Sequence, residues 1–263
     1  MGLSRKQYVR TGPVAFSTTA NTSVLTPGAG SQPDSIYLGA VEVGNSTGAN
    51  ASCGFGYFVP NAMWKAGQWD DSISASYTDD TTDAQDAGTD DFLMNMASPA
   101  NDDGFIIQSR EKFNSVYFSL TTAGSGGGIA TPNYAYWNGS AWTTFTPFLT
   151  AAYDSTGAKT FAFLKPADWT ALVAADTPVA TDGLTAGMYA IKVAWATAPT
   201  TEPQADFLKP ANLLDYVENV ADGASIVFNA QGEIKIPGRA SLMAFCNVAN
   251  AQNWVNVEYR FGG

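Results

Sequence analysis

The stretch YAYWNGSAWTTF, residues 134–145, places aromatic residues on both sides of an Asn-Gly pair. Asn138-Gly139 predicts a β-hairpin, because both central residues of a type I′ turn need a positive φ, which Asn and Gly adopt most easily. The flanking aromatic residue types favour a pleated, half-buried surface. They are Tyr134, Tyr136, Trp137, Trp142 and Phe145. The stretch therefore indicates a β architecture.

The composition of the whole chain points the same way. Its 263 residues allow one large β domain or two smaller ones, and a hydrophobic share of 45% is enough for a sizeable core. Charged residues make up only 14% of the chain, against about 25% in an average globular protein. Thr, Ser, Gly, Ala and Asn take their place, which is typical of short strands, tight turns and a surface more polar than charged.

Short segments of strand-forming residues, separated by turn residues, recur along the chain. Besides the hairpin, strands are expected at 36–43, 56–60, 73–77, 105–108, 115–122, 159–164, 187–196, 225–229, 233–237, 240–248 and 254–261. A single helix is expected at 208–220, with Pro210 near its start. We therefore expect an all-β fold, an antiparallel β-sandwich or jelly roll with one or two β domains.

The expected organisation is an N-terminal arm followed by three β regions. Residues 1–35 are rich in Ser, Thr, Gly and Pro and have weak periodicity, which indicates an extended arm. The β regions are expected at 36–103, at 104–205 as a sandwich module with the WNGSAW hairpin, and at 206–263 with the short helix and the C-terminal strands. The first and last β regions are expected to pair, with the middle one inserted between them.

The charge of the chain is acidic and unevenly distributed. Its net charge is −11, yet Arg5, Lys6 and Arg10 are the only charges before Asp34. An acidic chain disfavours nucleic acid as a partner, because affinity for it comes mainly from neutralising phosphates. No run of 18 apolar residues is present and the N-terminus lacks the apolar stretch of a secretory signal, so no membrane partner is expected.

The segment TDDTTDAQDAGTDD, residues 78–91, gathers carboxylates in one place. It fits a solvated acidic loop, and it also fits a loop that binds Ca²⁺ through oxygen ligands. The order of acidic residues and the closing Glu of an EF-hand are missing. No metal is therefore assigned to the segment from the sequence.

The residues needed for the common kinds of catalysis are missing. The chain has no His, which excludes Ser-His-Asp and Cys-His arrangements. It also lacks the glycine-rich motifs that hold nucleotide phosphates. Cys53 and Cys246 are the only cysteines, too few for a Cys₄ zinc site. Buried thiols are their expected state, and a disulfide between them also fits. We expect a protein that is not an enzyme and needs no cofactor.

Three segments occur in order in the middle of the chain: YAYWNGSAWTTF, FLKPADW at 163–169, and GMYAIKVAWATAPTTEP at 187–203. Together they resemble a module of tailed-bacteriophage virion structural proteins, most like a capsid decoration (cement) or head-fibre protein. The resemblance covers residues 115–203 and brings no catalytic residue with it. It implies a protein of the virion, on the capsid surface, made in the cytoplasm of the host bacterium.

We therefore expect a decoration protein that binds the outer capsid surface and stabilises the head. Its partners would be the major capsid protein and neighbouring copies of itself, in a homotrimer. The arm is expected to make the capsid contact, by charge and by burying apolar side chains. The arm residues concerned are Arg5, Lys6, Tyr8, Val9, Arg10 and Phe16.

A second hypothesis is a receptor- or glycan-binding appendage, a head fibre or tail protein. It would use exposed Trp or Tyr side chains on loops, because aromatic rings can stack on sugars. The chain has seven Trp, and core packing is their more common role. Core packing would bury the Trp side chains, whereas glycan binding would need some of them exposed to solvent.

Overall fold

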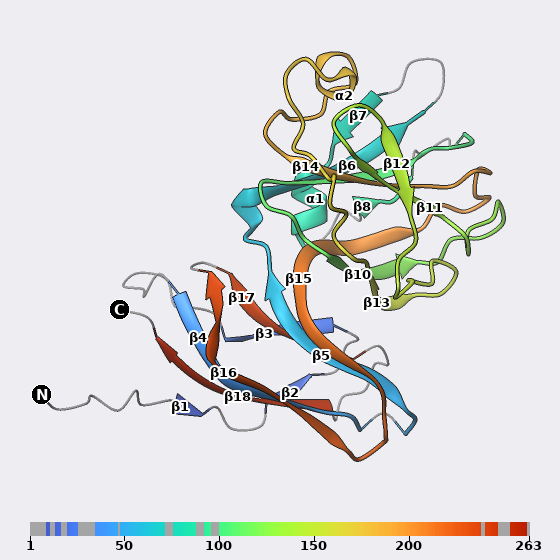
Figure 1. Cartoon of the computed structure of the whole chain (residues 1–263). Helices are drawn as coiled ribbons and strands as arrows, with labels where there is room; N and C mark the ends of the chain where they lie inside the picture. Colours follow the sequence, from blue (N-terminus) through green and yellow to red (C-terminus); the bar gives the residue numbers. More distant parts are fainter. Residues whose placement is uncertain are drawn as a thin grey trace, which may run out of the picture. The chain divides into compact units, whose positions relative to one another are not determined.

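The computed structural model describes residues 9–10, 14–16, 20–25, 35–46, 48–71, 76–87, 92–95, 100–237, 240–246 and 253–261. The chain divides into two compact units, shown in Figure 1. Unit 1 combines Met1–Pro60 with Asn212–Gly263, and unit 2 is Asn61–Ala211. The two ends of the chain therefore build one unit and the middle builds the other.

Unit 1 is made of strands from both ends of the chain. They are β1 (Val9–Arg10), β2 (Val14–Phe16), β3 (Ala20–Leu25), β4 (Ser35–Gly44), β5 (Ala51–Phe58), β16 (Ser225–Pro237), β17 (Ser241–Cys246) and β18 (Asn253–Phe261). One sheet has the order β1-β18-β4-β16, with β2 also paired to β18. In the other sheet, β17 lies between β5 and β3. All pairings given for these strands are antiparallel.

The core of unit 1 lies between its two sheets. In β18, buried Asn253, Val255 and Val257 alternate with half-buried residues, the period of two that a strand with one covered face requires. Buried apolar side chains come from both sheets, among them Leu38, Val41 and Val43 of β4, Phe55 of β5 and Leu242 of β17. Unit 1 is therefore an antiparallel β-sandwich.

Unit 2 shares the long strand Gln204–Val220 with unit 1, and its described residues also form nine strands and three short helical segments. They are η1 (Asn61–Met63), β6 (Trp64–Asp70), β7 (Ser76–Asp79), α1 (Thr81–Gln85), β8 (Phe92–Leu93), β9 (Gly104–Ser109), β10 (Ser115–Thr122), β11 (Asn133–Trp137), β12 (Trp142–Phe145), β13 (Gly157–Ala162), α2 (Thr177–Ala180) and β14 (Tyr189–Ala194). An antiparallel sheet has the order β12-β11-β14-β9-β6-β7. Strand β10 pairs with β13 in a second sheet.

Aromatic rings fill the core of unit 2. Tyr134 of β11 lies 5.1 Å from Phe161 of β13, ring centre to ring centre, which joins the two sheets. Trp169, from the FLKPADW segment, is buried against Phe113 at 5.3 Å. The all-β prediction is confirmed, and the chain forms antiparallel sheets throughout both units.

The first unit boundary follows from strand pairing. The sequence placed a boundary between residues 103 and 104, whereas the structure places it between 60 and 61. Strand β6 pairs with β9, and β9 pairs with β14, so residues 61–103 belong with the middle of the chain. The second boundary lies between residues 211 and 212, near the expected 205 and 206.

The predicted helix at 208–220 is wrong, because these residues lie in strand β15 (Gln204–Val220). The first part of β15 pairs with β10, where Leu208 is opposite Phe118. Its later residues run beside β5, and a Cβ added at Gly56 would lie 2.1 Å from the Asn212 carbonyl oxygen. Pairing with strands distant in sequence has therefore overridden the local helical pattern.

The predicted hairpin at Asn138-Gly139 is confirmed, but its turn type is not I′. Trp137 ends β11 and is opposite Trp142, the first residue of β12, so the loop has four residues, 138–141. Gly139 has a φ of +98°, and Asn138 is not among the residues with a positive φ. The Asn138 side chain instead organises the loop by hydrogen bonding.

Candidate functional site

A pocket of about 470 Å³ lies beside the hairpin strands of unit 2. Its volume is within the range of small-molecule sites, about 300–1,000 Å³. It is lined by residues 130–134 where β11 begins, by residues 144–147 where β12 ends, and by Thr150 and Ala151. The antiparallel pairing of Tyr134 with Phe145 brings the first two segments together.

Two aromatic rings of the pocket are held by the core beneath it. Phe145 is half-buried and its ring centre lies 4.7 Å from that of Phe163 and 5.8 Å from that of Tyr134. Tyr134 is itself buried against Phe161. An apolar ring fixed in this way offers a rigid surface for stacking.

The lining of the pocket is polar but carries no charge. Four threonines contribute hydroxyl groups: Thr131, Thr144, Thr146 and Thr150. Asn133 adds an amide, and among the described residues of the lining none has a charged side chain. Burial raises the pKa of the Tyr134 hydroxyl to about 12, so this group also stays neutral at physiological pH. The pocket therefore favours an uncharged ligand with hydroxyl or amide groups.

Asn138 fixes the hairpin loop next to this sheet. Its Oδ1 accepts hydrogen bonds from the backbone N–H groups of Ser140 and Ala141, both at 2.9 Å. Its Nδ2 donates to the Thr143 hydroxyl at 3.0 Å. One side chain thus satisfies several polar groups of the loop.

The three segments that carry the phage resemblance lie together in unit 2. The Tyr136 hydroxyl donates to Asp168 at 2.7 Å, and the Thr170 N–H donates to the Trp137 carbonyl at 3.1 Å. Strand β14 of the third segment pairs with β11 along residues 133–136. The motifs therefore form one connected part of the fold.

The tryptophan side chains serve mainly as core. All seven lie in the described part of the chain, and five are buried. Trp137 donates its indole N–H to Asp176 at 3.0 Å, and its ring packs against Trp142 at 5.8 Å. Trp142 and Trp254 are half-buried. The Trp pair of the hairpin thus braces the sheet.

Lys192 is a cation enclosed by aromatic rings on the same sheet. Its Nζ lies 5.1 Å from the centre of the Trp69 ring and 5.3 Å from that of Trp142. Burial lowers the pKa of Lys192, although Asp71, Asp102 and other carboxylates act in the opposite direction. The ammonium group covers the Trp faces that a sugar would need, so this cluster is structural.

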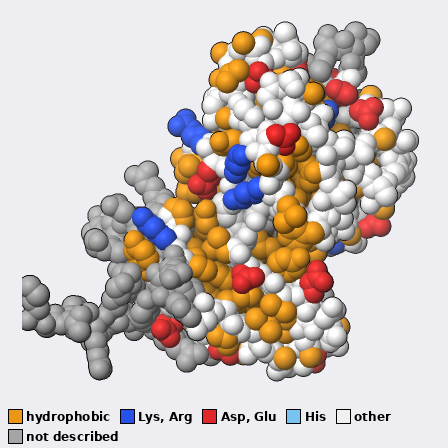
Figure 2. Space-filling view, viewed as in Figure 1, with side chains coloured by type: hydrophobic (Ala, Val, Ile, Leu, Met, Phe, Trp, Pro, Cys, Tyr) orange, Lys and Arg blue, Asp and Glu red, His pale blue; other side chains and the backbone are white. Residues whose placement is uncertain are grey.

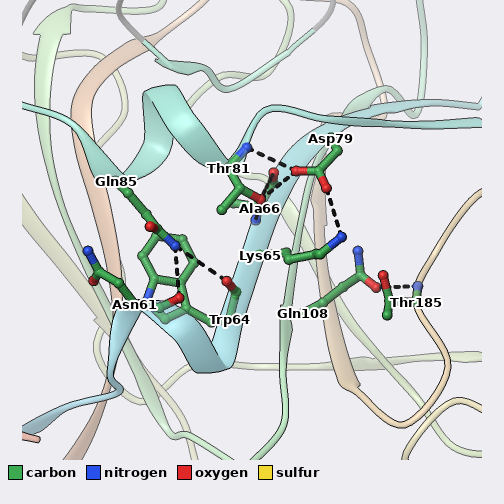
Figure 3. Close-up of polar contacts among 9 residues, drawn as sticks. All are labelled: Asn61, Trp64, Lys65, Ala66, Asp79, Thr81, Gln85, Gln108 and Thr185. Carbon is green, nitrogen blue, oxygen red and sulfur yellow. Dashed lines mark hydrogen bonds and ion pairs between the residues drawn. The ribbon is translucent and has the colours of Figure 1, made fainter. Parts of the chain in front are cut away.

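The acidic segment is partly regular structure, as Figure 3 shows for the contacts around β6 and α1. Asp79 ends β7, where it accepts a hydrogen bond from the Thr81 N–H at 3.1 Å and pairs with Lys65 at 3.0 Å. Burial alone would raise the pKa of Asp79, but the contacts with Thr81 and Lys65 lower it below its ordinary value. These contacts hold α1 against β6.

Gln residues add further polar contacts to this region. Gln85 of α1 donates to the carbonyl groups of Asn61 and Trp64, and Gln108 accepts from the Thr185 N–H at 2.7 Å (Figure 3). Within the described residues, no three His, Cys, Asp or Glu side chains are grouped closely enough to hold a metal ion. The contacts of Gln85 join α1 to η1 and to the first residue of β6.

The predicted arm residues fall partly outside the described residues. Arg5, Lys6 and Tyr8 lie there. Val9 and Arg10 form β1 and are opposite Tyr259 and Glu258 of β18, and Phe16 of β2 is opposite Asn253. The backbone of these three positions is thus paired with the C-terminal strand of the same unit.

The pocket could not have been located from the sequence, because its two main walls meet only through strand pairing. The sequence shows Thr and Pro residues near the hairpin but gives no sign that they surround a cavity.

Among the helices of the described chain, none is long and apolar enough to cross a membrane. No protein-family model, curated protein or solved structure matches this chain.

Proposed function

We propose that this chain is a non-enzymatic structural protein of a tailed-phage virion, which binds the outer capsid surface and stabilises the head. The resemblance over residues 115–203 supports the assignment to a virion. The observation that carries the capsid-binding role is the pairing of the N-terminal segment. Its short strands β1 and β2 pair with β18, and β3 pairs with β17, so one segment adds to both sheets of unit 1.

Strand addition of this kind suits an arm that grips a neighbour. Backbone hydrogen bonds supply affinity without requiring particular side chains from the partner. Strands β1 and β2 have only two and three residues, so little pairing is lost when they shift to a neighbouring sheet edge. Arg5, Lys6 and Tyr8 directly precede β1, and in the proposal they contact the adjacent capsid subunit.

The surface chemistry supports a protein that is covered by partners. Charged residues are only 14% of the chain, and Figure 2 shows patches of apolar side chains on the face in view, with charged side chains scattered among them. Large apolar side chains are exposed in both units, including Leu164 at 81% and Val227 at 61%. Specific interfaces typically bury about 1,600 Å² in total, and contacts with the capsid and with two further copies in a homotrimer would cover such residues.

Removal of the arm tests the capsid contact. A chain that lacks residues 1–19 keeps β3 to β18 and is expected to lose co-sedimentation with capsids that lack the decoration protein. The variant Phe145→Ala, altered in the pocket of unit 2, is the matched control and is expected to bind as the unaltered chain does. Unchanged capsid binding by the shortened chain would contradict the anchoring role of the arm.

A second candidate function, binding of a neutral saccharide, is favoured by the pocket beside the hairpin. Phe145 offers a ring for stacking, the surrounding threonines and Asn133 offer hydrogen-bonding groups, and the described lining is uncharged. Acidic sugars gain no ion pair from such a lining. This function fits a glycan-binding appendage of the virion and does not require the arm.

A glycan array with the purified chain, followed by calorimetry of any hit, tests the saccharide site. Phe145→Ala is expected to weaken binding about five- to 150-fold, taking for the sugar the roughly 1–3 kcal/mol that a nucleic-acid base gains by stacking on an aromatic ring. Phe148→Ala is the control, because Phe148 is 39% exposed and lies outside the pocket lining. Equal loss in both variants, or no saccharide bound, would contradict the site.

A further inference from the structure

The two cysteines of the chain meet in the core of unit 1. Cys53 of β5 and Cys246 of β17 are directly opposite each other across antiparallel strands. Both side chains are fully buried, and their sulfur atoms are 3.6 Å apart. No disulfide joins them, so both are thiols in this structure.

The backbone at this pair suits a disulfide. Residues directly opposite in an antiparallel sheet have Cα atoms about 4.5–5.5 Å apart, inside the range of about 4.4–6.8 Å found for disulfides. The sulfur atoms need to approach by about 1.5 Å to reach the bonded distance of about 2.05 Å. Small side-chain rotations on both strands can supply this movement without a change of register.

We propose that Cys53 and Cys246 form an intramolecular disulfide when the folded protein meets a peroxide. Hydrogen peroxide oxidises one thiol to a sulfenic acid and releases one water. The sulfur of the second thiol then attacks the sulfenic sulfur, the S–O bond breaks, and a second water leaves with the thiol proton. Two thiols and one hydrogen peroxide thus give one disulfide and two waters.

The bond is expected to form slowly, and only in oxidising surroundings. The hydrogen bond between the two thiols and their burial raise the pKa of the Cys53 thiol far above its ordinary value. The thiolate, which is the reactive form, is therefore scarce. A reducing cytoplasm keeps such thiols reduced while the chain folds, and an oxidising exterior favours the disulfide.

The consequence of the bond follows from where the cysteines lie in the chain. Cys53 precedes unit 2 and Cys246 follows it, with 193 positions between the two residue numbers. The disulfide would close a covalent loop that contains all of unit 2 and would link the N-terminal and C-terminal parts of unit 1. A closed loop of this length restricts the unfolded chain strongly, which stabilises the fold.

Oxidation of the purified full-length chain tests the proposal. The reduced protein is treated with hydrogen peroxide under native conditions, the peroxide is removed with catalase, and thiols are alkylated after denaturation. We expect an unalkylated monomer lighter by two hydrogens, a peptide that links Cys53 to Cys246, and a Tm of unit 1 higher by roughly 5–10 °C. A reductant is expected to restore the original Tm.

The double variant Cys53→Ala/Cys246→Ala controls for other effects of peroxide, and its Tm is expected not to respond. A linked chain with an unchanged or lower Tm would contradict the stabilising effect of the bond. Alkylation of both cysteines after peroxide treatment, or a disulfide between two chains, would overturn the proposal. Oxidation of either thiol to a sulfinic acid, seen as the addition of two oxygens, would also overturn it.

Discussion

Asp80 lies at the start of α1, where its carboxylate is only partly exposed to water. Burial and the neighbouring Asp83 raise its pKa from 3.8 to about 6, while a hydrogen bond from Gln68 opposes the rise. The folded state therefore binds this proton more tightly than the unfolded chain does. The stabilising contribution of the protonated form is complete below pH 3.8 and is lost as the pH rises to about 6.

Replacing Asp80 with Asn removes this titration while keeping the shape of the side chain. Asp80→Asn is expected to stabilise unit 2 by about 1 kcal/mol at pH 7.5, a value discounted for solvent screening, and to have little effect at pH 3.5. Calorimetric Tm values at the two pH values measure the difference. Asp154→Asn, a change at an exposed carboxylate of the same unit, is the control. Equal effects of Asp80→Asn at both pH values would contradict the assignment.

At the residue scale, the sequence predicted the roles that depend on side-chain type alone. Core packing was given as the more common role of Trp, and Trp169 is buried, because a large aromatic residue gains most from the core. The cation–π contacts of Lys192 were not predicted, since they need Trp69 and Trp142 from strands far apart in the chain. The pocket at Phe145 was missed for the same reason.

At the scale of elements, strand β15 shows where local patterns stop being informative. Residues 208–220 have apolar residues at helix-like spacing, and isolated propensity favoured a helix. The alternating Gly54 and Gly56 of β5 leave room for the backbone of β15. A Cβ at Gly54 would lie 2.4 Å from the Asp215 carbonyl oxygen, so β5 tolerates only glycine there.

Gly67 in β6 makes a similar close contact, and its replacement tests the packing of the unit 2 sheet. A Cβ at Gly67 would lie 2.0 Å from the Thr78 carbonyl oxygen and 2.7 Å from the Tyr77 ring, so β7 must move. Gly67→Ala is expected to destabilise unit 2 by about 2–4 kcal/mol in denaturant unfolding.

The matched control is Gly157→Ala in β13. A Cβ added at Gly157 would have no contact within 4 Å, but φ at this position is +93°. Gly157→Ala is expected to destabilise unit 2 only through backbone strain, by about 1–2 kcal/mol. A larger loss from Gly157→Ala than from Gly67→Ala would contradict the close approach of β6 and β7.

The hairpin loop offers a second test at this scale. Asn138→Ala removes the acceptor for the N–H groups of Ser140 and Ala141 and is expected to destabilise unit 2 by about 1–2 kcal/mol. Asn138→Asp retains the acceptor and is expected to lose less. Thermal unfolding of both variants compares them, and equal losses would show that the acceptor is unimportant.

At the scale of the whole molecule, the sequence of unit 2 is inserted between the two halves of the sequence of unit 1. The sequence predicted that the first and last β regions pair, and β4 does lie between β16 and β18. The position of the first boundary needed the pairing of β6 with β9, which composition does not reveal.

This organisation predicts that unit 2 folds alone. A chain of residues 61–211 contains its own sheets and core and is expected to unfold cooperatively, with a β-type circular dichroism spectrum. A chain of residues 1–60 is expected to stay unfolded, because the partners of β4 come from the C-terminal part. An unfolded 61–211 chain would contradict the division into units.

The proposed role on the capsid is tested most directly by the copy number of this chain on purified virions. Quantitative mass spectrometry with isotope-labelled peptides compares it with the major capsid protein. A decoration protein is expected in a fixed proportion to the capsid subunits, and that proportion is expected to fall when residues 1–19 are deleted. A few copies per particle, or a proportion that is unaffected by loss of the arm, would contradict the proposal.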